Sequence, residues 1–519
     1  MMTRRSFVPL IFAAPTLLRA QAAANRVVID PLRVRATIDR RIWGSFLEHL
    51  GRAIYQGIYE PGSALADAAG FRKDVAGEVR SMGVPIIRYP GGNFVSGYNW
   101  LDGVGPRDKR PIVLDRAWNS IETNQFGTNE FVTWAKSVGA EPLIGTNFGT
   151  AAAEMSAALV EYCNVPGGTK WSNLRREHGY AQPHAIRTWC LGNEMDGNWQ
   201  IGHMPAREYG RKAVDAARQM RAVDPAVQLI ACGSSGPGQS TFLEWDREVL
   251  EECYSQVDGI SLHRYYGNDA TGETGGNSLK YLALNLAMEE QIDQVAAVCE
   301  YVRKRMGSGK RLWLSFDEWN VWYRRRGGDG QRQQAPHLLE EEYNLEDALL
   351  VGGLVNALLR RSDKVRVACL AQLVNVIAPI VTNASGLLRQ SIYYPYSWAL
   401  ESARGQALDA FVESAVIEGI PAIDSAVTFD RATGQYCVLL LNRDLLQPRE
   451  AVLVFRDNAP TRSLRFDTLT GADLKAVNTF AEPNKVKPGA LESPRVGERM
   501  VLQLPARSYS RLVLQAVPA

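Results

Sequence analysis

Eight continuous apolar runs, each ending at polar residues, recur along residues 41–400 of this 519-residue chain. Apolar runs without alternation are typical of strands buried on both faces, and hence of a parallel sheet. Helical patterns lie between them, so the alternation predicts an α/β fold of the (β/α)8 TIM barrel type. An open doubly wound sheet is the alternative, although no G-x-G-x-x-G opens a helix after an early strand. The runs are 42–48, 84–88, 142–147, 186–194, 228–233, 259–263, 312–318 and 365–372, and the helical stretches include 71–82, 129–138, 205–223, 241–257, 293–306 and 345–361.

The last part of the chain has a different pattern. Short alternating runs separated by Pro, Gly, Asn and Asp follow residue 400, which predicts an antiparallel, jelly-roll-like β-sandwich. Residues 25–40 alternate in part, and we expect them to add strands to the same sandwich. The expected order is therefore an export segment at 1–24, strands at 25–40, a barrel at 41–400 and a C-terminal sandwich at 401–519.

An export signal is expected at the N-terminus. Arg4 and Arg5 precede an apolar stretch at 7–18 that is too short for a comfortable membrane span, and an A-x-A cleavage site follows at 20–22. The paired arginines resemble a twin-arginine signal, with a general secretory signal as the alternative. The sequence thus predicts an exported protein, periplasmic or secreted, and a cytoplasmic one only if the signal does not function.

Charge and cysteine usage argue against several classes of function. Lys+Arg 58 against Asp+Glu 56 leaves a net charge of +2, which gives no support to nucleic-acid or polybasic membrane binding. The seven cysteines are widely spaced and lack C-x-x-C, so we expect buried thiols and no disulfide framework. The sequence has no H-E-x-x-H, and Glu48 and His49 would point to opposite faces of a strand, so we expect no metal and no cofactor.

Two glutamates, Glu194 and Glu318, each end one of the apolar runs. The active site of such a barrel lies at the carboxyl ends of its strands, so both side chains are expected in one pocket. Glycoside hydrolysis with retention needs a nucleophilic carboxylate and a protonated carboxylic acid about 5 Å apart. Position alone does not say which glutamate has which role, and two ordinary surface glutamates are the alternative.

Four polar residues near these strand ends each have a chemical and a structural interpretation. Asn193 either binds a sugar hydroxyl beside the scissile bond or occupies a turn. Arg88 either fixes a catalytic carboxylate or forms a structural salt bridge, and both can hold together. His263 or Tyr265 either orients Glu318 or is a satisfied structural residue.

Six long motifs carry a family resemblance. They lie at 48–61, 88–100, 189–197, 261–267, 314–322 and 371–379, and include W-C-L-G-N-E-M-D-G and L-S-F-D-E-W-N-V-W around the two glutamates. Together they resemble glycoside hydrolase family 51, the retaining α-L-arabinofuranosidases with a catalytic barrel. The resemblance runs from about residue 26 to the C-terminus.

The resemblance implies roles for the site residues. Glu194 is implied to be the acid/base and Glu318 the nucleophile, with Arg88 and His263 as supports of the carboxylates. It also implies a sandwich packed on the barrel and a homo-oligomer, often a hexamer. Arg264 stands where Gln is more usual in the family, which bears only on local subsite detail. The residues implied to surround the sugar are Glu48, Asn93, Asn193, Tyr265, Trp322 and Gln372.

The sequence therefore predicts a retaining, exo-acting α-L-arabinofuranosidase. Its expected substrates are arabinan, arabinoxylan or arabino-oligosaccharides, with no nucleic-acid partner and no membrane association after removal of the signal. An endo-acting β-glucanase or xylanase of the same clan is one alternative. A non-catalytic carbohydrate-binding protein is the other, although the presence of both glutamates argues against it.

Overall fold

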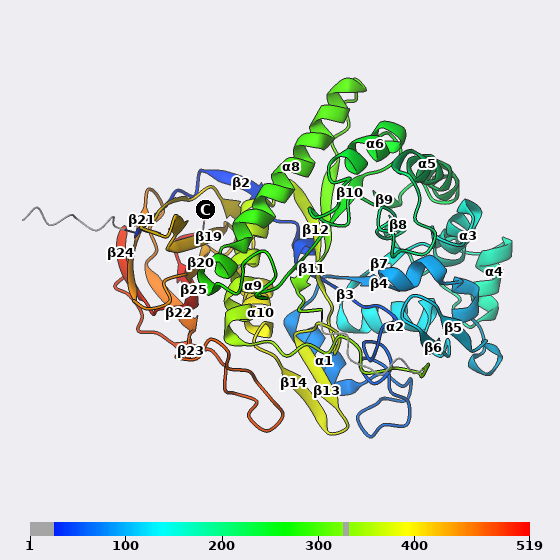
Figure 1. Ribbon diagram of the computed structural model, residues 1–519, viewed down its shortest axis with the longest axis horizontal. Coiled ribbons are helices and arrows are strands. Elements are labelled where there is room, and N and C mark those ends of the chain that lie inside the picture. Colours follow the sequence, from blue (N-terminus) through cyan, green and yellow to red (C-terminus); the bar gives the residue numbers. More distant parts are fainter. Residues whose placement is uncertain (1–24, 325–331, 519) are drawn as a thin grey trace, which may run out of the picture.

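The computed structural model describes residues 25–324 and 332–518, and its larger part is a closed barrel of eight parallel strands. The strand order around the barrel is β10-β11-β12-β3-β4-β7-β8-β9, which confirms the predicted barrel and excludes the open sheet (Figure 1). Each predicted apolar run supplies one strand. The strands are β3 (Gly44–Phe46), β4 (Ile86–Tyr89), β7 (Glu141–Gly145), β8 (Thr188–Leu191), β9 (Gln228–Ala231), β10 (Gly259–Tyr266), β11 (Trp313–Val321) and β12 (Val365–Ala371).

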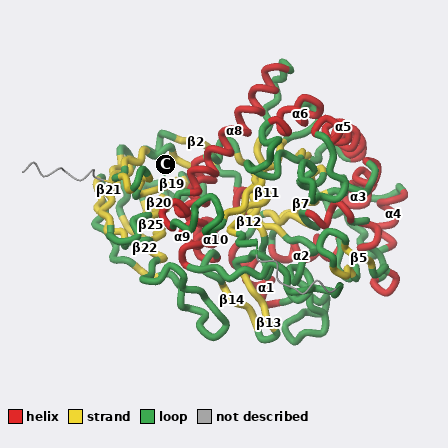
Figure 2. The backbone as a smooth tube through the Cα atoms, viewed as in Figure 1, coloured by secondary structure: helices red, strands yellow, loops and turns green. Residues whose placement is uncertain are grey.

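Helices cover the outside of the barrel (Figure 2). In α1 (Lys73–Met82) the apolar residues Val75, Val79 and Met82 are buried, and Gly83 ends the helix with φ 72°, which glycine adopts without strain. Helix α8 (Leu284–Arg305) begins before the predicted residue 293, because Leu284 and its following apolar residues extend the buried face. The other helices are α2 (Thr128–Val138), α3 (Ala153–Asn164), α4 (Lys170–Glu177), α5 (Ala206–Val223), α6 (Glu244–Cys253), α7 (Ser278–Leu282), α9 (Leu345–Arg360) and α10 (Tyr393–Ser402), with 3-10 turns η1 (Arg40–Trp43), η2 (Asn93–Gly97), η3 (Trp100–Gly103) and η4 (Arg107–Lys109).

The C-terminal part forms two packed sheets, on the left in Figure 1. One has the order β2-β15-β19-β20-β25-β22-β23 and the other β16-β1-β21-β24. The early strands β1 (Asn25–Ile29) and β2 (Val34–Thr37) each join one sheet, and β1 runs parallel to β21 in otherwise antiparallel surroundings. The remaining strands here are β15 (Gln406–Leu408), β16 (Phe411–Glu413), β19 (Ile423–Asp430), β20 (Gln435–Asn442), β21 (Arg449–Phe455), β22 (Arg462–Leu469), β23 (Gly489–Ala490), β24 (Arg499–Leu504) and β25 (Ser508–Gln515).

A buried polar cluster joins the barrel to this sandwich. Asp424 on β19 accepts hydrogen bonds from Asn356 at 2.7 Å and Arg360 at 2.9 Å, both on α9, and from Arg443 at 3.2 Å. Burial acts to raise the pKa of Asp424, but the two arginines outweigh it and hold the pKa well below its usual value. The sandwich is therefore fixed to the barrel by charged as well as apolar contacts.

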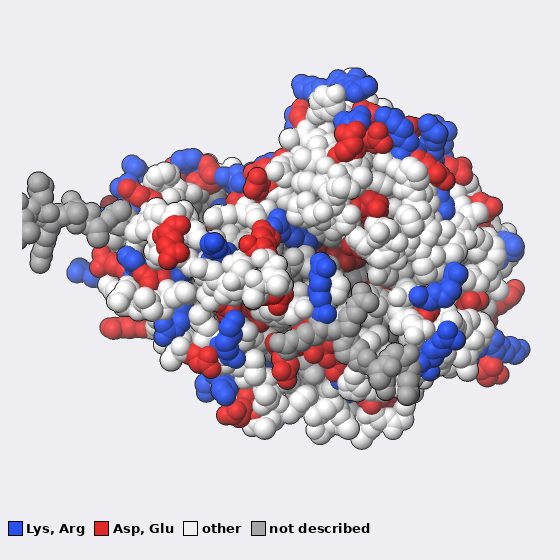
Figure 3. All heavy atoms as spheres, viewed as in Figure 1, with Lys and Arg blue, Asp and Glu red and all other residues white. Residues whose placement is uncertain are grey.

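Short two-stranded hairpins stand outside the barrel and the sandwich sheets, and the outer surface carries charges of both signs. The hairpins pair β5 (Val113–Asp115) with β6 (Ser120–Glu122), β13 (Ile380–Asn383) with β14 (Gly386–Arg389), and β17 (Val416–Ile417) with β18 (Ile420–Pro421). Positive and negative side chains are interspersed on the face in Figure 3, in line with the near-zero net charge. Among the described residues, none of the helices is both long and apolar enough to cross a bilayer.

Candidate active site

Glu318 and Glu194 reach the same end of the barrel from strands β11 and β8. Glu318 lies inside β11, where it is paired with His263 on β10. The strand was expected to end at Glu318, but it continues to Val321 because its last residues are also buried. Glu194 lies three residues beyond β8, and both Gly192 (φ 92°) and Glu194 (φ 45°) are left-handed. This backbone costs about 1–3 kcal/mol at a non-glycine residue, so the surrounding loop must hold it.

An irregularity in β11 aims two consecutive carboxylates at one centre. The pairing of β11 with β12 shifts register between Phe316 and Trp319. In a regular strand Asp317 and Glu318 would point to opposite faces, whereas here both form ion pairs with Arg88. Sequence reasoning missed Asp317, whose one signal was a charged residue inside an apolar run.

Arg88, on β4, is fully buried and contacts three of the site residues. Its Nη1 donates to Glu318 Oε1 at 2.6 Å, its Nη2 donates to Asn193 Oδ1 at 2.7 Å, and its Nε lies 3.6 Å from Asp317 Oδ2. Burial acts to lower the pKa of Arg88, but the charges of Asp317 and Glu318 outweigh it and raise the pKa well above its usual value. Arg88 therefore stays charged and fixes one oxygen of Glu318.

Tyr265, on β10, holds the other oxygen of Glu318. Its hydroxyl donates to Oε2 at 2.8 Å. Burial and the neighbouring carboxylates raise the pKa of Tyr265 well above its usual value, so the phenol keeps the proton that it donates. The ring of Trp322 packs edge-on against Tyr265, with 5.1 Å between the ring centroids. Glu318 thus has one donor on each oxygen.

His263 connects Glu194 to Asp317. Its Nδ1 lies 2.9 Å from Glu194 Oε1, and its Nε2 lies 3.1 Å from Asp317 Oδ1. Burial acts to lower the pKa of His263, but Glu318, Asp317 and Glu194 outweigh it and raise the pKa to about 10. At neutral pH the ring is therefore an imidazolium that donates from both nitrogens. Of the two residues expected beside Glu318, Tyr265 hydrogen-bonds it and His263 instead hydrogen-bonds Glu194.

The spacing of the two glutamates decides which chemistry suits them. One oxygen of Glu194, one of Glu318 and a ring nitrogen of His263 all lie within 4.8 Å of one another. Retaining glycosidases place their carboxyl groups about 5 Å apart, whereas inverting ones need roughly 6.5–9.5 Å. Three such groups could also hold a metal, but a metal would have to displace His263 from its contacts with Glu194 and Asp317. The cluster is better suited to proton transfer.

Glu48 follows β3 and is 3% exposed. The Phe94 backbone N–H and the Trp118 indole N–H both donate to its Oε1 at 2.9 Å. Burial, with a smaller effect of Glu318, raises the pKa of Glu48 to about 8 even though these donors act to lower it. The raised pKa favours the protonated acid near neutral pH, and the two donors on Oε1 leave Oε2 to carry its proton. The side-chain oxygen of Gln372 accepts a hydrogen bond from the Glu48 backbone N–H at 2.9 Å.

Gly92 keeps the space between two of these carboxyl groups clear. A Cβ atom at Gly92 would lie 3.1 Å from Glu318 Oε1 and 3.3 Å from Glu48 Oε2. Any side chain at this position would crowd both groups. The tight turn at Gly91 and Gly92, directly after β4, is thus a requirement of the site.

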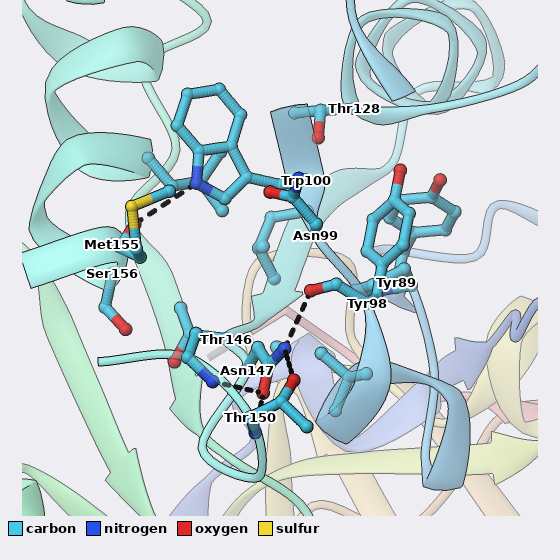
Figure 4. Close-up of a pocket in the computed structure, with 16 residues that line it drawn as sticks. Tyr89, Tyr98, Asn99, Trp100, Thr128, Thr146, Asn147, Thr150, Met155 and Ser156 are labelled. Atoms are coloured by element: carbon cyan, nitrogen blue, oxygen red, sulfur yellow. Dashed lines mark hydrogen bonds between the residues drawn. The ribbon is translucent and has the colours of Figure 1, made fainter. Parts of the chain in front are cut away.

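The two other asparagines at the strand ends lie differently. Asn93 is half-buried at the start of η2, and its backbone oxygen accepts a hydrogen bond from Gln200 at 3.5 Å. Asn147 ends the predicted run 142–147, but it donates to the Tyr98 carbonyl at 2.8 Å and lines a separate cavity of about 190 Å³ (Figure 4). Residues such as Trp100 form the walls of this cavity, and neither glutamate of the pair does. Asn147 therefore does not belong to the carboxylate centre.

Two tryptophans contact carboxyl groups of the site without any signal in the sequence. Trp118, in the turn between β5 and β6, donates to Glu48. Trp199, in the loop after β8, donates its indole N–H to Glu194 Oε2 at 2.8 Å. Both lie in irregular segments, where no periodicity marks a buried or inward face, so sequence reasoning missed them.

Family models and known proteins match most of the chain. The Alpha-L-arabinofuranosidase 1 domain matches residues 78–275, and the Alpha-L-arabinofuranosidase C-terminal domain matches residues 317–508. The intracellular exo-alpha-(1->5)-L-arabinofuranosidase 1 of Bacillus subtilis is 47% identical over 470 residues, covering 89% of this chain and 93% of the relative. The intracellular exo-alpha-(1->5)-L-arabinofuranosidase of Halalkalibacterium halodurans is 47% identical over 465 residues, covering 88% and 92%. A solved family 51 α-L-arabinofuranosidase from Bifidobacterium longum superimposes with a TM-score of 0.91 at 36% identity, over 95% of this chain and 100% of that one.

These matches correct one prediction and confirm another. Both bacterial relatives are named intracellular, so the prediction of an exported, periplasmic or secreted protein is wrong. It rested on paired arginines before a short apolar stretch, a brief pattern that arises by chance, and the predicted signal at 1–24 lies outside the described residues. The family resemblance rested on six long motifs, and the matches bear it out. The chain is a glycoside hydrolase and belongs to family 51, the α-L-arabinofuranosidases.

Proposed function

We propose that the protein is a retaining, exo-acting enzyme that removes terminal non-reducing α-L-arabinofuranosyl residues from arabinan, arabinoxylan or arabino-oligosaccharides. The observation that carries this proposal is the pair Glu194 and Glu318, with oxygens within 4.8 Å of each other. That spacing lets one carboxylate attack while the other carboxyl group donates a proton. The names of the two bacterial relatives support an exo-acting arabinofuranosidase in the cytoplasm.

Glu318 is the nucleophile in this proposal. The donors Arg88 and Tyr265, one on each of its oxygens, favour the charged carboxylate. An oxygen of Glu318 attacks the anomeric carbon, and the bond from that carbon to the glycosidic oxygen breaks. Glu194 gives its proton to the glycosidic oxygen, so the remaining sugar leaves as a neutral alcohol. The arabinosyl unit is then held as an ester of Glu318.

Glu194 acts as a base in the second half of the reaction. Its carboxylate takes a proton from water, the water oxygen attacks the anomeric carbon, and the bond to Glu318 breaks. Arabinose leaves with the configuration of the substrate, since two inversions have occurred. The His263 imidazolium, 2.9 Å from Glu194 Oε1, stabilises the negative charge that Glu194 carries between the two steps.

The other site residues bind and orient in this proposal. Glu48 meets sugar hydroxyls with Oε2 in this proposal, because Phe94 and Trp118 donate to Oε1. Arg88 and His263 support the two carboxylates. We also infer a division into early strands at 25–40, a catalytic barrel at 41–400 and a sandwich at 401–519, assembled as a homo-oligomer with a hexamer as the expected state. The residues that contact the arabinofuranose in this proposal are Glu48, Asn93, Asn193, Tyr265, Trp322 and Gln372.

The experiment is a panel of α-L-arabinofuranosides and arabinose-containing polymers with chromatography of the products. Free arabinose as the first product supports the exo-acting enzyme. Oligosaccharides without arabinose would indicate an endo-acting glycanase, and sugar binding without hydrolysis would indicate a binding protein. Glu318→Ala should abolish turnover of an aryl α-L-arabinofuranoside, and near-normal turnover would contradict the assignment. Glu194→Ala needs a natural substrate as well, because an activated aryl group leaves with little help from an acid.

A further inference from the structure

Trp199 is a large aromatic residue held at the mouth of the site. Its side chain is 48% exposed, yet its indole Nε1–H donates to Glu194 Oε2 at 2.8 Å. Core packing does not account for a half-exposed indole. The contact with a catalytic carboxyl group gives a reason for its position.

The loop that carries Trp199 is tied down on both sides of the indole. The Gly197 N–H donates to the Glu194 carbonyl at 2.9 Å, and Ser235 donates its backbone N–H and hydroxyl to Asp196 at 2.9 and 3.0 Å. The Gln200 amide donates to Ser96 at 2.5 Å. These bonds make the loop between β8 and α5 a fixed support.

Gly197 forms the seat of the indole. A Cβ atom at Gly197 would lie 2.5 Å from both Cε2 and Cζ2 of Trp199, well inside contact distance. The ring therefore lies directly on the glycine backbone, and a side chain at 197 would displace it. The loop is thus shaped around this one orientation of Trp199.

The two oxygens of Glu194 have different environments. Oε1 lies 2.9 Å from Nδ1 of His263, a ring that also contacts Asp317. Oε2 accepts from the Trp199 indole N–H at 2.8 Å. Each oxygen therefore has one fixed partner and a further lone pair for the catalytic proton.

We propose that Trp199 is a positioning residue for Glu194, whose indole N–H orients Oε2 and stabilises the charged carboxylate that activates water. This inference rests on the proposed function and deepens it. A donor on Oε2 favours the charged form over the protonated one. It also keeps the carboxyl plane fixed while the proton leaves and returns.

Several charged or titratable groups face Glu194 and are unchanged by a substitution at Trp199. His263 on β10 contacts Oε1, Glu318 on β11 lies within 4.8 Å, and Tyr265 on β10 interacts electrostatically with it. Asp196 on the same loop adds a further negative charge nearby. Arg88 on β4 reaches the centre through Glu318. A change on replacing Trp199 therefore reports the lost indole contact.

The test compares the pH dependence of kcat/KM for wild type and Trp199→Phe on an aryl α-L-arabinofuranoside and on an arabino-oligosaccharide. Phenylalanine keeps an aromatic ring and removes the N–H, so the charged form of Glu194 loses a donor. The alkaline limb should move to higher pH by about 0.5–1 unit. Activity on the oligosaccharide near the optimum should fall about threefold to tenfold. Gly197→Ala keeps the tryptophan at position 199 but pushes its indole away from Glu194, so it should move the alkaline limb in the same direction.

A matched control is Trp171→Phe on α4, whose ring packs against Trp100, and it should leave the profile unchanged. An unmoved alkaline limb in Trp199→Phe, with circular dichroism showing a folded protein, overturns the inference even if activity falls. If wild type itself fails to hydrolyse the arabinofuranosides, the proposed function fails, and the inference fails with it. If wild type hydrolyses the arabinofuranosides and Trp199→Phe has the same pH profile of kcat/KM, only the inference about Trp199 is refuted.

Discussion

Replacing Glu48 with glutamine tests whether a neutral acid is buried in the site. Phe94 and Trp118 both donate to Oε1, and burial raises the pKa of Glu48 from 4.5 to about 8. The amide of Glu48→Gln can keep its oxygen at Oε1 and place its NH2 at Oε2, so it mimics the protonated acid. We therefore expect the variant to retain activity at pH 5–7 within about tenfold.

The stability of the two proteins should diverge with pH. A carboxyl group whose pKa is raised on folding contributes stability below its unfolded value of 4.5, and this contribution is lost as the pH rises through about 8. The full loss corresponds to about 5 kcal/mol at about 1.4 kcal/mol per pKa unit. Between pH 5 and pH 7.5, Glu48→Gln should therefore gain roughly 3 kcal/mol relative to wild type.

The assay is urea unfolding followed by tryptophan fluorescence at several pH values between 5 and 7.5. Glu48→Ala is the internal control, because it also removes the carboxyl group but leaves the Trp118 and Phe94 donors without their acceptor. It should show the same pH slope as Glu48→Gln, offset to lower stability by about 1–3 kcal/mol. A stability difference between wild type and Glu48→Gln that does not change with pH would refute the reasoning.

Two further predictions concern the domain contact and the catalytic cluster. Asp424→Asn leaves Arg443 without its buried counter-charge and Arg360 with Glu289 alone, and should cost about 3–5 kcal/mol at pH 7. Because the folded pKa of Asp424 is lowered, the difference from wild type should shrink as the pH falls below about 4, and a pH-independent melting difference would contradict this. Chelators such as EDTA should leave kcat/KM unchanged, since both ring nitrogens of His263 are engaged by carboxylates. A loss of activity that Zn²⁺ or Mn²⁺ restores would show that Glu194, His263 and Glu318 bind a metal.

The sequence predicted the barrel well because its strands are buried on both faces and therefore appear as continuous apolar runs. Helices α3 and α10 lack a clear helical pattern of apolar residues. Most residues of α3 are apolar, so no single face stands out, and α10 carries Pro395 in its first turn. Burial and periodicity thus predict the scaffold better than its individual outer helices.

The site was predictable only where long motifs or strand ends marked it. Asp317 was missed because a register shift in β11 breaks the alternation that would have sent it away from Glu318. Trp118 and Trp199 come from loops, and their contacts with Glu48 and Glu194 depend on how distant segments meet. Nor could the sequence show that Phe94 and Trp118 donate to the same oxygen of Glu48.

The most direct test of the central claim is the configuration of the first product. With methanol as the acceptor, the methyl arabinofuranoside formed from an aryl α-L-arabinofuranoside is analysed by NMR before any secondary reaction. Oxygens of Glu194 and Glu318 within 4.8 Å of each other predict two displacements at the anomeric carbon, and hence the methyl α-L-arabinofuranoside. The methyl β-L-arabinofuranoside as the first product would contradict the account.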